Sequence, residues 1–330
     1  MLNNQTALFA NMIDKVNQII LAPMEGVLDY SMRELLTSIN QFDYCVTEFV
    51  RVTDHRLTKK TFYRLCPELY HGGKTHSDTP VRIQLLGQIP ALMAENAALA
   101  IELGSFGIDI NCGCPAKSVV GNQGGAFLLK SPELIYQITK QVREKIGYTA
   151  PLSVKIRLGF ADKSQCFEIA DAVEQGGATE IVIHGRTKND GYQANKIDWL
   201  TIGNIKKRLH IPVIANGEIV SAASAQKCIK QSQTDNIMIG RGILAIPNLA
   251  NIIRFGDTPL SWQEIMLILQ KYATKKPFIK QLQHKPLYHS ARIKQWLSYL
   301  KQHYPEAQTL LAKIRTLNTQ QDIIEALHFK

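Results

Sequence analysis

The 330-residue chain has no hydrophobic run that approaches the roughly 20 residues needed by a transmembrane helix. Residues 1–18 contain neither a basic start nor an uninterrupted apolar stretch, so we expect no secretory signal. The six cysteines are scattered and lack the spacing of a disulfide framework. These absences argue against a membrane partner and favour a reduced, cytoplasmic globular protein.

Acidic residues are too few to balance the basic ones, and the formal net charge is +10 at pH 7. Residues 256–330 contain 11 Lys/Arg against 5 Asp/Glu and carry +6, whereas the other 255 residues carry only +4. A basic segment of this kind indicates a polyanionic partner. On charge alone, a solvated helical face is an equally good interpretation.

Short β-rich runs alternate with helical patterns up to residue 255. Continuous apolar strands that alternate with helices predict a parallel sheet, and eight of them can close into a (β/α)₈ TIM barrel. The segment 51–79 fits the helical pattern poorly, so we expect a loop excursion there. The predicted strands are residues 19–22, 44–49, 81–85, 107–110, 152–156, 180–183, 211–215 and 236–239.

Beyond residue 255 only helical patterns remain, at 262–272, 288–303, 307–317 and 321–327. Ser261 is a candidate N-cap at the junction. We therefore expect an α/β chain with three parts. They are an N-terminal extension (1–18), a barrel catalytic domain (19–255) and a small C-terminal helical bundle (256–330).

Active sites of such barrels lie at the carboxyl ends of the strands. In this chain all eight predicted ends carry polar or glycine-rich motifs, which structural requirements alone do not explain. They are Pro23-Met24-Glu25-Gly26, Glu48, Gln84, Asn111 with Cys114, Lys155 with Arg157, His184-Gly185-Arg186, Asn216-Gly217-Glu218 and Gly240-Arg241-Gly242.

The motifs after strands seven and eight indicate a phosphate site. Barrels of this kind bind phosphate there through backbone amides, and Arg241 can add charge-assisted hydrogen bonds. Gln84 and Lys155, across the mouth, are suited to the pyrimidine edge of a flavin. An ion pair of Lys155 with Glu25 or Glu48 is an equally good interpretation at this point.

Two thiols, Cys112 and Cys114, end the fourth strand, and the glycine-rich loop 121–125 follows. Reactive groups beside such a loop predict a catalytic residue that moves to meet its substrate. A thiol of pKa about 8.5 is mostly protonated at neutral pH and can act as an acid. The residues alone leave open which thiol reacts. Zinc sites usually pair two ligand clusters, and no second cluster is present, so we predict no metal.

The strand-end motifs together resemble the tRNA-dihydrouridine synthases over residues 19–300. Two further segments, 48–52 and 291–297, resemble the bacterial C-type branch of that family, which acts on uridine 16 of tRNA. The family motifs are Leu21-Ala22-Pro23-Met24-Glu25-Gly26, Asn111-Cys112-Gly113-Cys114-Pro115, Val154-Lys155-Ile156-Arg157, His184-Gly185-Arg186-Thr187, Asn216-Gly217-Glu218-Ile219 and Gly240-Arg241-Gly242.

The resemblance implies FMN as cofactor, NADPH as reductant and reduction of the C5–C6 double bond of a D-loop uridine in tRNA. Hydride would go to C6, and Cys114 would give a proton to C5. The residues implied to bind FMN are Pro23, Met24, Glu25, Gln84, Lys155, His184, Asn216, Gly217, Glu218, Gly240 and Arg241.

The uridine must leave its stack to reach a barrel mouth, so base flipping is implied. Asn111 would position the uracil, and basic side chains would hold the RNA. The other candidates for substrate or tRNA contact are Arg51, Arg157, Arg186, Lys285, Arg292 and Lys294. Trp296 and Tyr299 are expected in the core of the bundle, and we expect a monomer.

Two alternatives stay open. An FMN-dependent oxidoreductase acting on a free pyrimidine would share the strand ends but have little use for a basic helical domain. A non-catalytic tRNA-binding protein would not need Cys114, Lys155 or the phosphate-site glycines.

Overall fold

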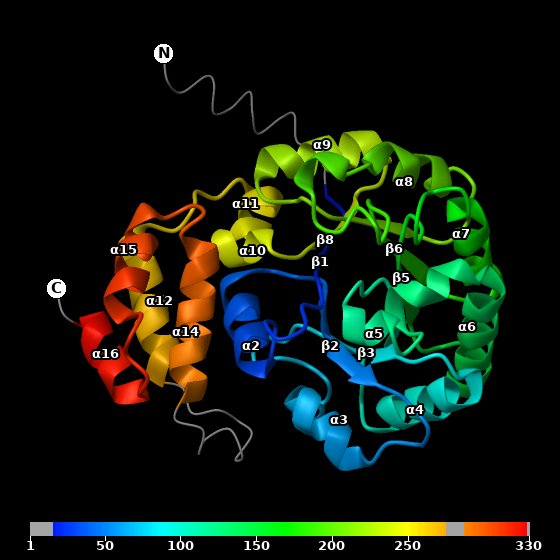
Figure 1. Ribbon diagram of the computed structural model, residues 1–330, viewed down its shortest axis with the longest axis horizontal. Helices are drawn as coiled ribbons and strands as arrows, with labels where there is room; N and C mark the ends of the chain where they lie inside the picture. The colour runs from blue at the N-terminus through cyan, green and yellow to red at the C-terminus, as the bar shows by residue number, and fades with distance from the viewer. Residues whose placement is uncertain (1–15, 275–286, 329–330) are drawn as a thin grey trace.

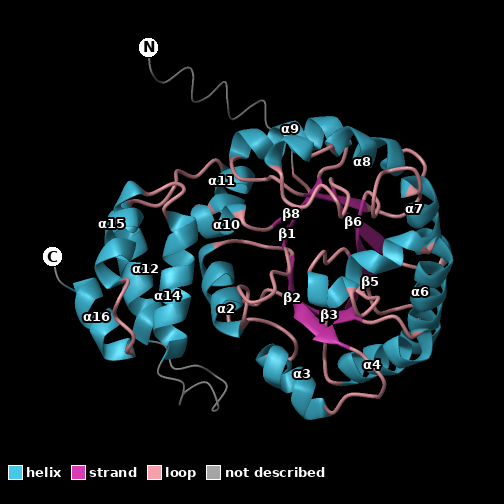
Figure 2. Cartoon of the chain, viewed as in Figure 1, coloured by secondary structure: helices cyan, strands magenta, loops and turns pink. Residues whose placement is uncertain are grey.

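The computed structural model describes residues 16–274 and 287–328. Eight parallel strands form a closed barrel in sequence order, with β1 paired to both β2 and β8 (Figure 2). The predicted TIM barrel is therefore confirmed. The strands are β1 Gln18–Leu21, β2 Tyr44–Arg51, β3 Val81–Leu86, β4 Ile108–Cys112, β5 Leu152–Arg157, β6 Glu180–His184, β7 Val213–Asn216 and β8 Asn236–Ile239.

The strands are buried on both faces, which is why their sequences are almost continuously apolar. In β1, Ile19 and Leu21 belong to the core between sheet and helices, whereas Ile20 belongs to a separate cluster inside the barrel. The same alternation in β4 turns Asp109 and Asn111 away from the face that buries Ile108, Ile110 and Cys112.

Helices surround the sheet (Figure 1). The N-caps follow from sequence: Ser131 accepts a hydrogen bond from Leu134 N at 3.3 Å, and Ser221 forms a capping box with Ser224. The long helices of the barrel are α2 Tyr30–Ile39, α4 Pro90–Glu102, α6 Pro132–Ile146, α7 Cys166–Gln175, α8 Trp199–Lys206, α9 Ala222–Ser232 and α11 Leu249–Phe255. Shorter elements are α5 Lys117–Val120, η2 Gly125–Lys130, η3 Ala194–Lys196 and α10 Gly242–Ala245.

The segment 51–79, expected as a loop, is partly helical: it forms α3 Lys59–Leu65 and η1 Pro67–His71. The expectation failed because this segment depends on a distant partner. The buried Glu68 accepts hydrogen bonds from Nε and Nη2 of Arg33 in α2, at 2.7 and 2.9 Å. This ion pair ties the excursion to the barrel.

Beyond the barrel, the described residues form the helices expected there: α12 Trp262–Thr274, α14 Leu287–Leu300, α15 Pro305–Ile314 and α16 Gln320–His328. Figure 1 shows them together on one side, next to α10 and α2. Ser261 and Glu264 form the expected cap of α12. Trp296 is buried, and its indole N–H donates to Leu244 O at 3.1 Å, which confirms its core role. Tyr299 is only half-buried and lines a cavity.

Within residues 16–274 and 287–328, no helix combines the length and the apolar character needed to cross a membrane. Lys285 and residues 1–15 lie outside the described residues, so the expectations for them are untested.

Candidate active site

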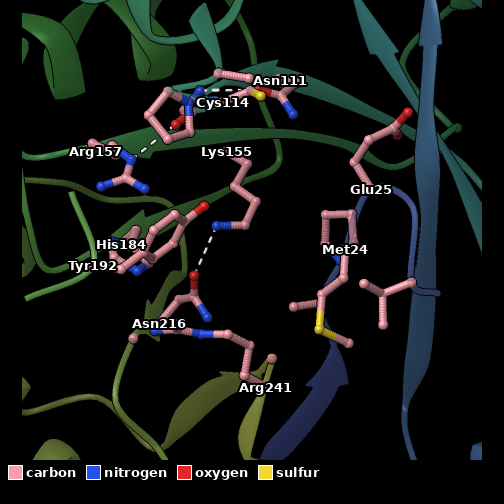
Figure 3. Close-up of a pocket in the computed structure, with 18 of the residues that line it drawn as sticks. Met24, Glu25, Asn111, Cys114, Lys155, Arg157, His184, Tyr192, Asn216 and Arg241 are labelled. Atoms are coloured by element: carbon pink, nitrogen blue, oxygen red, sulfur yellow. Dashed lines mark hydrogen bonds between the residues drawn. The ribbon is translucent and has the colours of Figure 1, made fainter. Parts of the chain in front are cut away.

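A cavity of about 860 Å³ opens at the carboxyl ends of the strands. The strand-end motifs predicted from sequence meet there because parallel strands deliver their carboxyl ends to one rim. Figure 3 shows Cys114 and Arg241 at opposite ends of the view, with Lys155 between them and Met24 and Glu25 to one side. The cavity is lined by all eleven residues expected to bind FMN, and by Arg51, Asn111, Cys114 and Arg157.

One end of the cavity is built from the turns after β7 and β8. Gly217 has φ +110°, and a Cβ on it would lie 2.7 Å from Ile197 Cδ1, so only glycine fits. A Cβ on Gly240 would meet nothing closer than Ala22 Cβ at 3.7 Å. The backbone at Gly240 is therefore open to a close-fitting group such as a phosphate.

Glu218 organises the cations at this end. Its carboxylate forms ion pairs with Arg241 at 3.2 Å and with Arg186 at 2.9 Å. Arg186 is entirely buried behind Glu218, and its Nε donates to Gln193 O at 2.7 Å. This burial favours a positioning role for Arg186 over the direct substrate contact expected from sequence.

Lys155 donates from Nζ to Asn216 Oδ1 at 2.7 Å, and Asn216 Nδ2 donates to Met238 O at 2.8 Å. The alternative pairing of Lys155 with Glu25 or Glu48 is therefore wrong. Burial lowers the pKa of Lys155 to about 8, against the opposing effect of the Asp109 carboxylate. The ammonium is still the main form at neutral pH.

His184 is a neutral imidazole. Burial, together with the cations around it, lowers its pKa well below the usual value. Its Nδ1 is buried and has no hydrogen-bond partner among the described residues. An orphaned buried polar atom beside a lysine, an arginine and an open glycine backbone fits a polar, phosphate-bearing cofactor such as a flavin mononucleotide.

The two thiols lie in different environments. Cys112 is fully buried in the core between sheet and helices, whereas Cys114 lines the cavity. Asn111 separates them, because its Oδ1 accepts from the N–H groups of Gly113 and Cys114, at 3.0 and 2.9 Å, and bends the chain. Burial raises the pKa of the Cys114 thiol. A substrate in the cavity would therefore meet one protonated thiol, that of Cys114.

The glycine-rich loop packs directly on Cys114. Gly125 has φ +57°, and a Cβ on it would lie 2.8 Å from Cys114 O and 3.1 Å from Cys114 Cβ. Ala126 N donates to Cys114 O at 3.0 Å. The loop thus supports the thiol in this conformation, and the expected movement of the loop stays a prediction.

A hydrogen-bonded chain inside the barrel holds Asn111. The buried Asp109 accepts from Gln84 Nε2 and from Ser153 Oγ, both at 2.6 Å, and Gln84 Oε1 accepts from Asn111 Nδ2 at 2.8 Å. Burial raises the pKa of Asp109 to about 6, so the carboxylate prevails at neutral pH. A carboxylate can only accept hydrogen bonds, so Asp109 fixes the orientation of the Gln84 amide. The Gln84 oxygen then faces Asn111 and fixes the orientation of the Asn111 amide. Asp109 was not identified as a site residue from the sequence. An acidic residue at a position of β4 that faces the barrel interior would have indicated it.

Tyr192 was also missed. Its ring lies 5.2 Å from the guanidinium of Arg157 and 4.7 Å from that of Arg241, and it is edge-on to His184. Arg157 itself is buried and donates to backbone oxygens, including Gly113 O at 2.8 Å. Tyr192 follows Gly191 in a loop after β6, a position that strand-end patterns do not reveal.

The basic residues expected to hold tRNA differ in exposure and in their hydrogen-bond and ion-pair partners. Arg292 pairs with Asp29, and Nε to Oδ2 is 3.0 Å. This favours a role in fixing α14 to the β1–α2 loop over contact with a polyanion. Lys294 is half-exposed, and its Nζ lies 3.5 Å from Asn318 Oδ1. In the described part of the chain, no group of three or more His, Cys, Asp and Glu side chains forms a metal site.

Comparison with known sequences places these features in a family. The family model for dihydrouridine synthase (Dus) matches residues 20–329. A protein of Escherichia coli (strain K12) named tRNA-dihydrouridine(16) synthase is 54% identical over 310 residues, 94% of this chain and 97% of that protein. A protein of the same name from Haemophilus ducreyi is 56% identical over 305 residues, 92% of this chain and 93% of its own length.

Solved structures share the fold. Morphinone reductase in complex with tetrahydroNAD matches with a TM-score of 0.51 and 11% identity, over 74% of this chain and 88% of the reductase. A 2-naphthoyl-CoA reductase complex matches with a TM-score of 0.55 and 13% identity, over 73% and 50% of the two chains. The fold, the motifs and the close relatives agree, and the chain belongs to the dihydrouridine synthase family.

Proposed function

We propose that this chain reduces the C5–C6 double bond of uridine 16 in the D-loop of tRNA, with FMN as cofactor and NADPH as electron donor. The observation that carries the proposal is one cavity that holds a protonated thiol, Cys114, and a cationic end built around Arg241. Relatives with 54% and 56% identity named tRNA-dihydrouridine(16) synthase support the choice of substrate.

The family uses a flavin, and the residues of the cavity fit one. When bound, FMN supplies the hydride that reduces C6 of the uracil. Gly217, Gly240 and Arg241 would hold the phosphate, and Lys155 would place its ammonium beside the ring. The other expected FMN residues, which line the same cavity, are Pro23, Met24, Glu25, Gln84, His184, Asn216 and Glu218.

Cys114 would complete the reaction by donating its proton to C5. Its raised pKa keeps the thiol protonated at neutral pH, as a general acid requires. Asn111 lines the cavity next to Cys114 and is suited to position the uracil. The flipped base would leave the rest of the tRNA outside, against Arg51 at the rim and against the helices after residue 255.

We also propose the division into an N-terminal extension, a catalytic barrel that ends at residue 255 and an RNA-binding helical domain (256–330), working as a monomer in the cytoplasm. The barrel begins at Gln18 and not at residue 19, because Gln18 is the first residue of β1 and pairs with Asn236 of β8. The helical segment carries +6 of the net charge, which supports the RNA-binding assignment. Lys294 and Lys285 are its candidates for phosphate contact.

The experiment that separates the alternatives uses the purified, flavin-loaded protein. Oxidation of NADPH under anaerobic conditions is expected only when unmodified tRNA is added. Turnover with free uridine or uracil would favour an oxidoreductase of free pyrimidines. A colourless protein that binds tRNA without oxidising NADPH would favour a non-catalytic binder.

Asp109→Asn tests the hydrogen-bonded chain behind Cys114. An amide in place of the carboxylate can donate to Gln84, which removes the fixed orientation of Asn111. We expect single-turnover reduction to slow by about 10- to 100-fold, the worth of a hydrogen bond to a charged group, with tRNA affinity unchanged. Iodoacetamide labelling of Cys114 should change in rate as well.

Ser153→Ala is the control for this prediction, because it removes one donor to Asp109 and leaves the bond from Gln84. It should alter turnover by much less. Equal rates of labelling and turnover in Asp109→Asn and wild-type protein would contradict the positioning role.

Binding of tRNA is expected to depend strongly on salt. About four phosphate contacts predict a fall in affinity on the order of 100-fold between 50 and 200 mM salt. The flavin content, which depends on groups inside the cavity such as Lys155 and His184, should not change over this range. Fluorescence anisotropy of labelled tRNA and flavin absorbance measure the two quantities, and salt-independent tRNA affinity would count against a basic RNA-binding face.

A further inference from the structure

The segment between β2 and β3 holds a second concentration of positive charge. Residues 51–79 contain six Lys/Arg and three Asp/Glu, a net +3, whereas all residues outside 256–330 carry +4. One of the three acidic residues, Glu68, is buried against Arg33 and does not face solvent. Apart from this excursion and the helical segment 256–330, the chain is close to neutral.

The excursion starts at the rim of the active-site cavity. Phe49 and Arg51, at the end of β2, line the cavity, and Arg51 Nη1 lies 3.5 Å from Ser118 O across the rim. The chain then runs outward into α3 and η1. Figure 1 shows α3 at the edge of the barrel, beside β2 and α2. A polymer whose nucleotide enters the cavity therefore passes the start of this excursion, at Arg51.

Three cations of the excursion form no close ion pair with a carboxylate among the described residues, although the Glu102 carboxylate lies within electrostatic range of Arg56. They are Arg56, just before α3, and Lys60 and Arg64, which lie one helical turn apart on α3. All three are exposed. Lys59 differs from them, because it is neutralised by Glu102 at 3.0 Å.

Two tyrosines form a flat aromatic surface beside these cations. The rings of Tyr63 in α3 and Tyr70 in η1 stack with centroids 4.1 Å apart and an angle of 16° between their planes. Tyr70 is 58% exposed. This exposure is unusual for a large apolar ring, which folding usually buries. Tyr63 is fixed by the helix and supports Tyr70 from behind.

We propose that Arg56, Lys60, Arg64 and the Tyr63–Tyr70 stack form an auxiliary RNA-binding surface, which we name the α3 surface. It takes phosphates of the bound tRNA on Lys60 and Arg64, and an unpaired base on the outer face of Tyr70. Cations interleaved with a stacking ring are the features by which proteins hold single-stranded RNA. This inference rests on the proposed function, since it concerns a second contact with the same substrate.

The test compares two variants with matched controls by anisotropy of labelled tRNA at 50, 100 and 200 mM salt. Lys60→Ala/Arg64→Ala should bind tRNA more weakly and lower the slope of log affinity against log salt by about 1.5, because two phosphate contacts are lost. Tyr70→Ala should weaken binding by about 5- to 100-fold, the range measured for loss of a base–aromatic stack, and leave the slope unchanged. Tyr70→Phe keeps the ring and should restore binding.

Lys227→Ala/Lys230→Ala is the charge-matched control, since both lysines are exposed on α9, away from α3 (Figure 1). It should bind tRNA as the wild-type protein does. If Lys60→Ala/Arg64→Ala and Tyr70→Ala bind within twofold of that control, the α3 surface is not an RNA contact. Tyr70 and Lys60 touch no part of the cavity, so tRNA-dependent NADPH oxidation by the wild-type protein tests the proposed function separately.

Discussion

Cys114→Ala is expected to slow single-turnover reduction of tRNA by about 100- to 10,000-fold, the contribution of a general acid. The thiol lines the cavity, and burial keeps it protonated at neutral pH. Without it, the proton for C5 has to come from water that the filled cavity largely excludes. The variant should retain its flavin, because Lys155 and Arg241 are unchanged. Rapid mixing of the pre-reduced protein with tRNA measures the rate.

Cys112→Ala is the matched control for this experiment. Cys112 belongs to the apolar core, so its loss should lower the free energy of unfolding and leave the rate of reduction near that of the wild-type protein. A fast reaction in Cys114→Ala, or a slow one in a folded Cys112→Ala, would overturn the assignment of the acid.

Lys155→Met is expected to cost about 100- to 1,000-fold in the rate of reduction, as the loss of a preorganised charged donor does elsewhere. Methionine has a similar length but cannot donate to Asn216 or offset negative charge on a reduced flavin. We also expect weaker flavin binding. Flavin fluorescence on dilution measures the affinity, and stopped-flow absorbance measures the rate. A variant with wild-type affinity and rate would remove Lys155 from the site.

The pH dependence of flavin binding follows from the same lysine. Its pKa of about 8 lies below the ordinary value of 10.5, so the folded protein loses the ammonium as pH rises through 8. Flavin affinity should therefore fall above pH 8, and Lys155→Met should lack this fall. The stability of the folded protein is expected to change with pH in the opposite direction to the flavin affinity. Between pH 8 and 10.5 the unfolded chain binds the proton more strongly, so this group makes the folded state more stable as pH rises.

The barrel was predictable because its signal is local. Apolar runs that alternate with helices define eight strands, and parallel closure alone brings their ends together at one cavity. That is why residues as distant in sequence as Met24 and Arg241 were both placed correctly at the cavity.

The remaining features depend on partners that sequence spacing does not reveal. Arg186 and Arg292 carry the charge expected of substrate-binding residues, but Glu218 and Asp29 pair with them. The excursion depends in the same way on Arg33 and Glu68, which are 35 residues apart. Which charge in a sequence is neutralised inside the fold is a tertiary property, and local patterns do not contain it.

The most direct test of the proposed function is to map dihydrouridine in tRNA from a strain in which the gene for this chain is deleted. Reverse transcription or mass spectrometry of individual tRNAs gives the position of each modified uridine. We predict that dihydrouridine at position 16 is lost and returns when the wild-type chain is supplied, but not when Cys114→Ala is supplied. Normal dihydrouridine at position 16 in the deletion strain would contradict the proposed function.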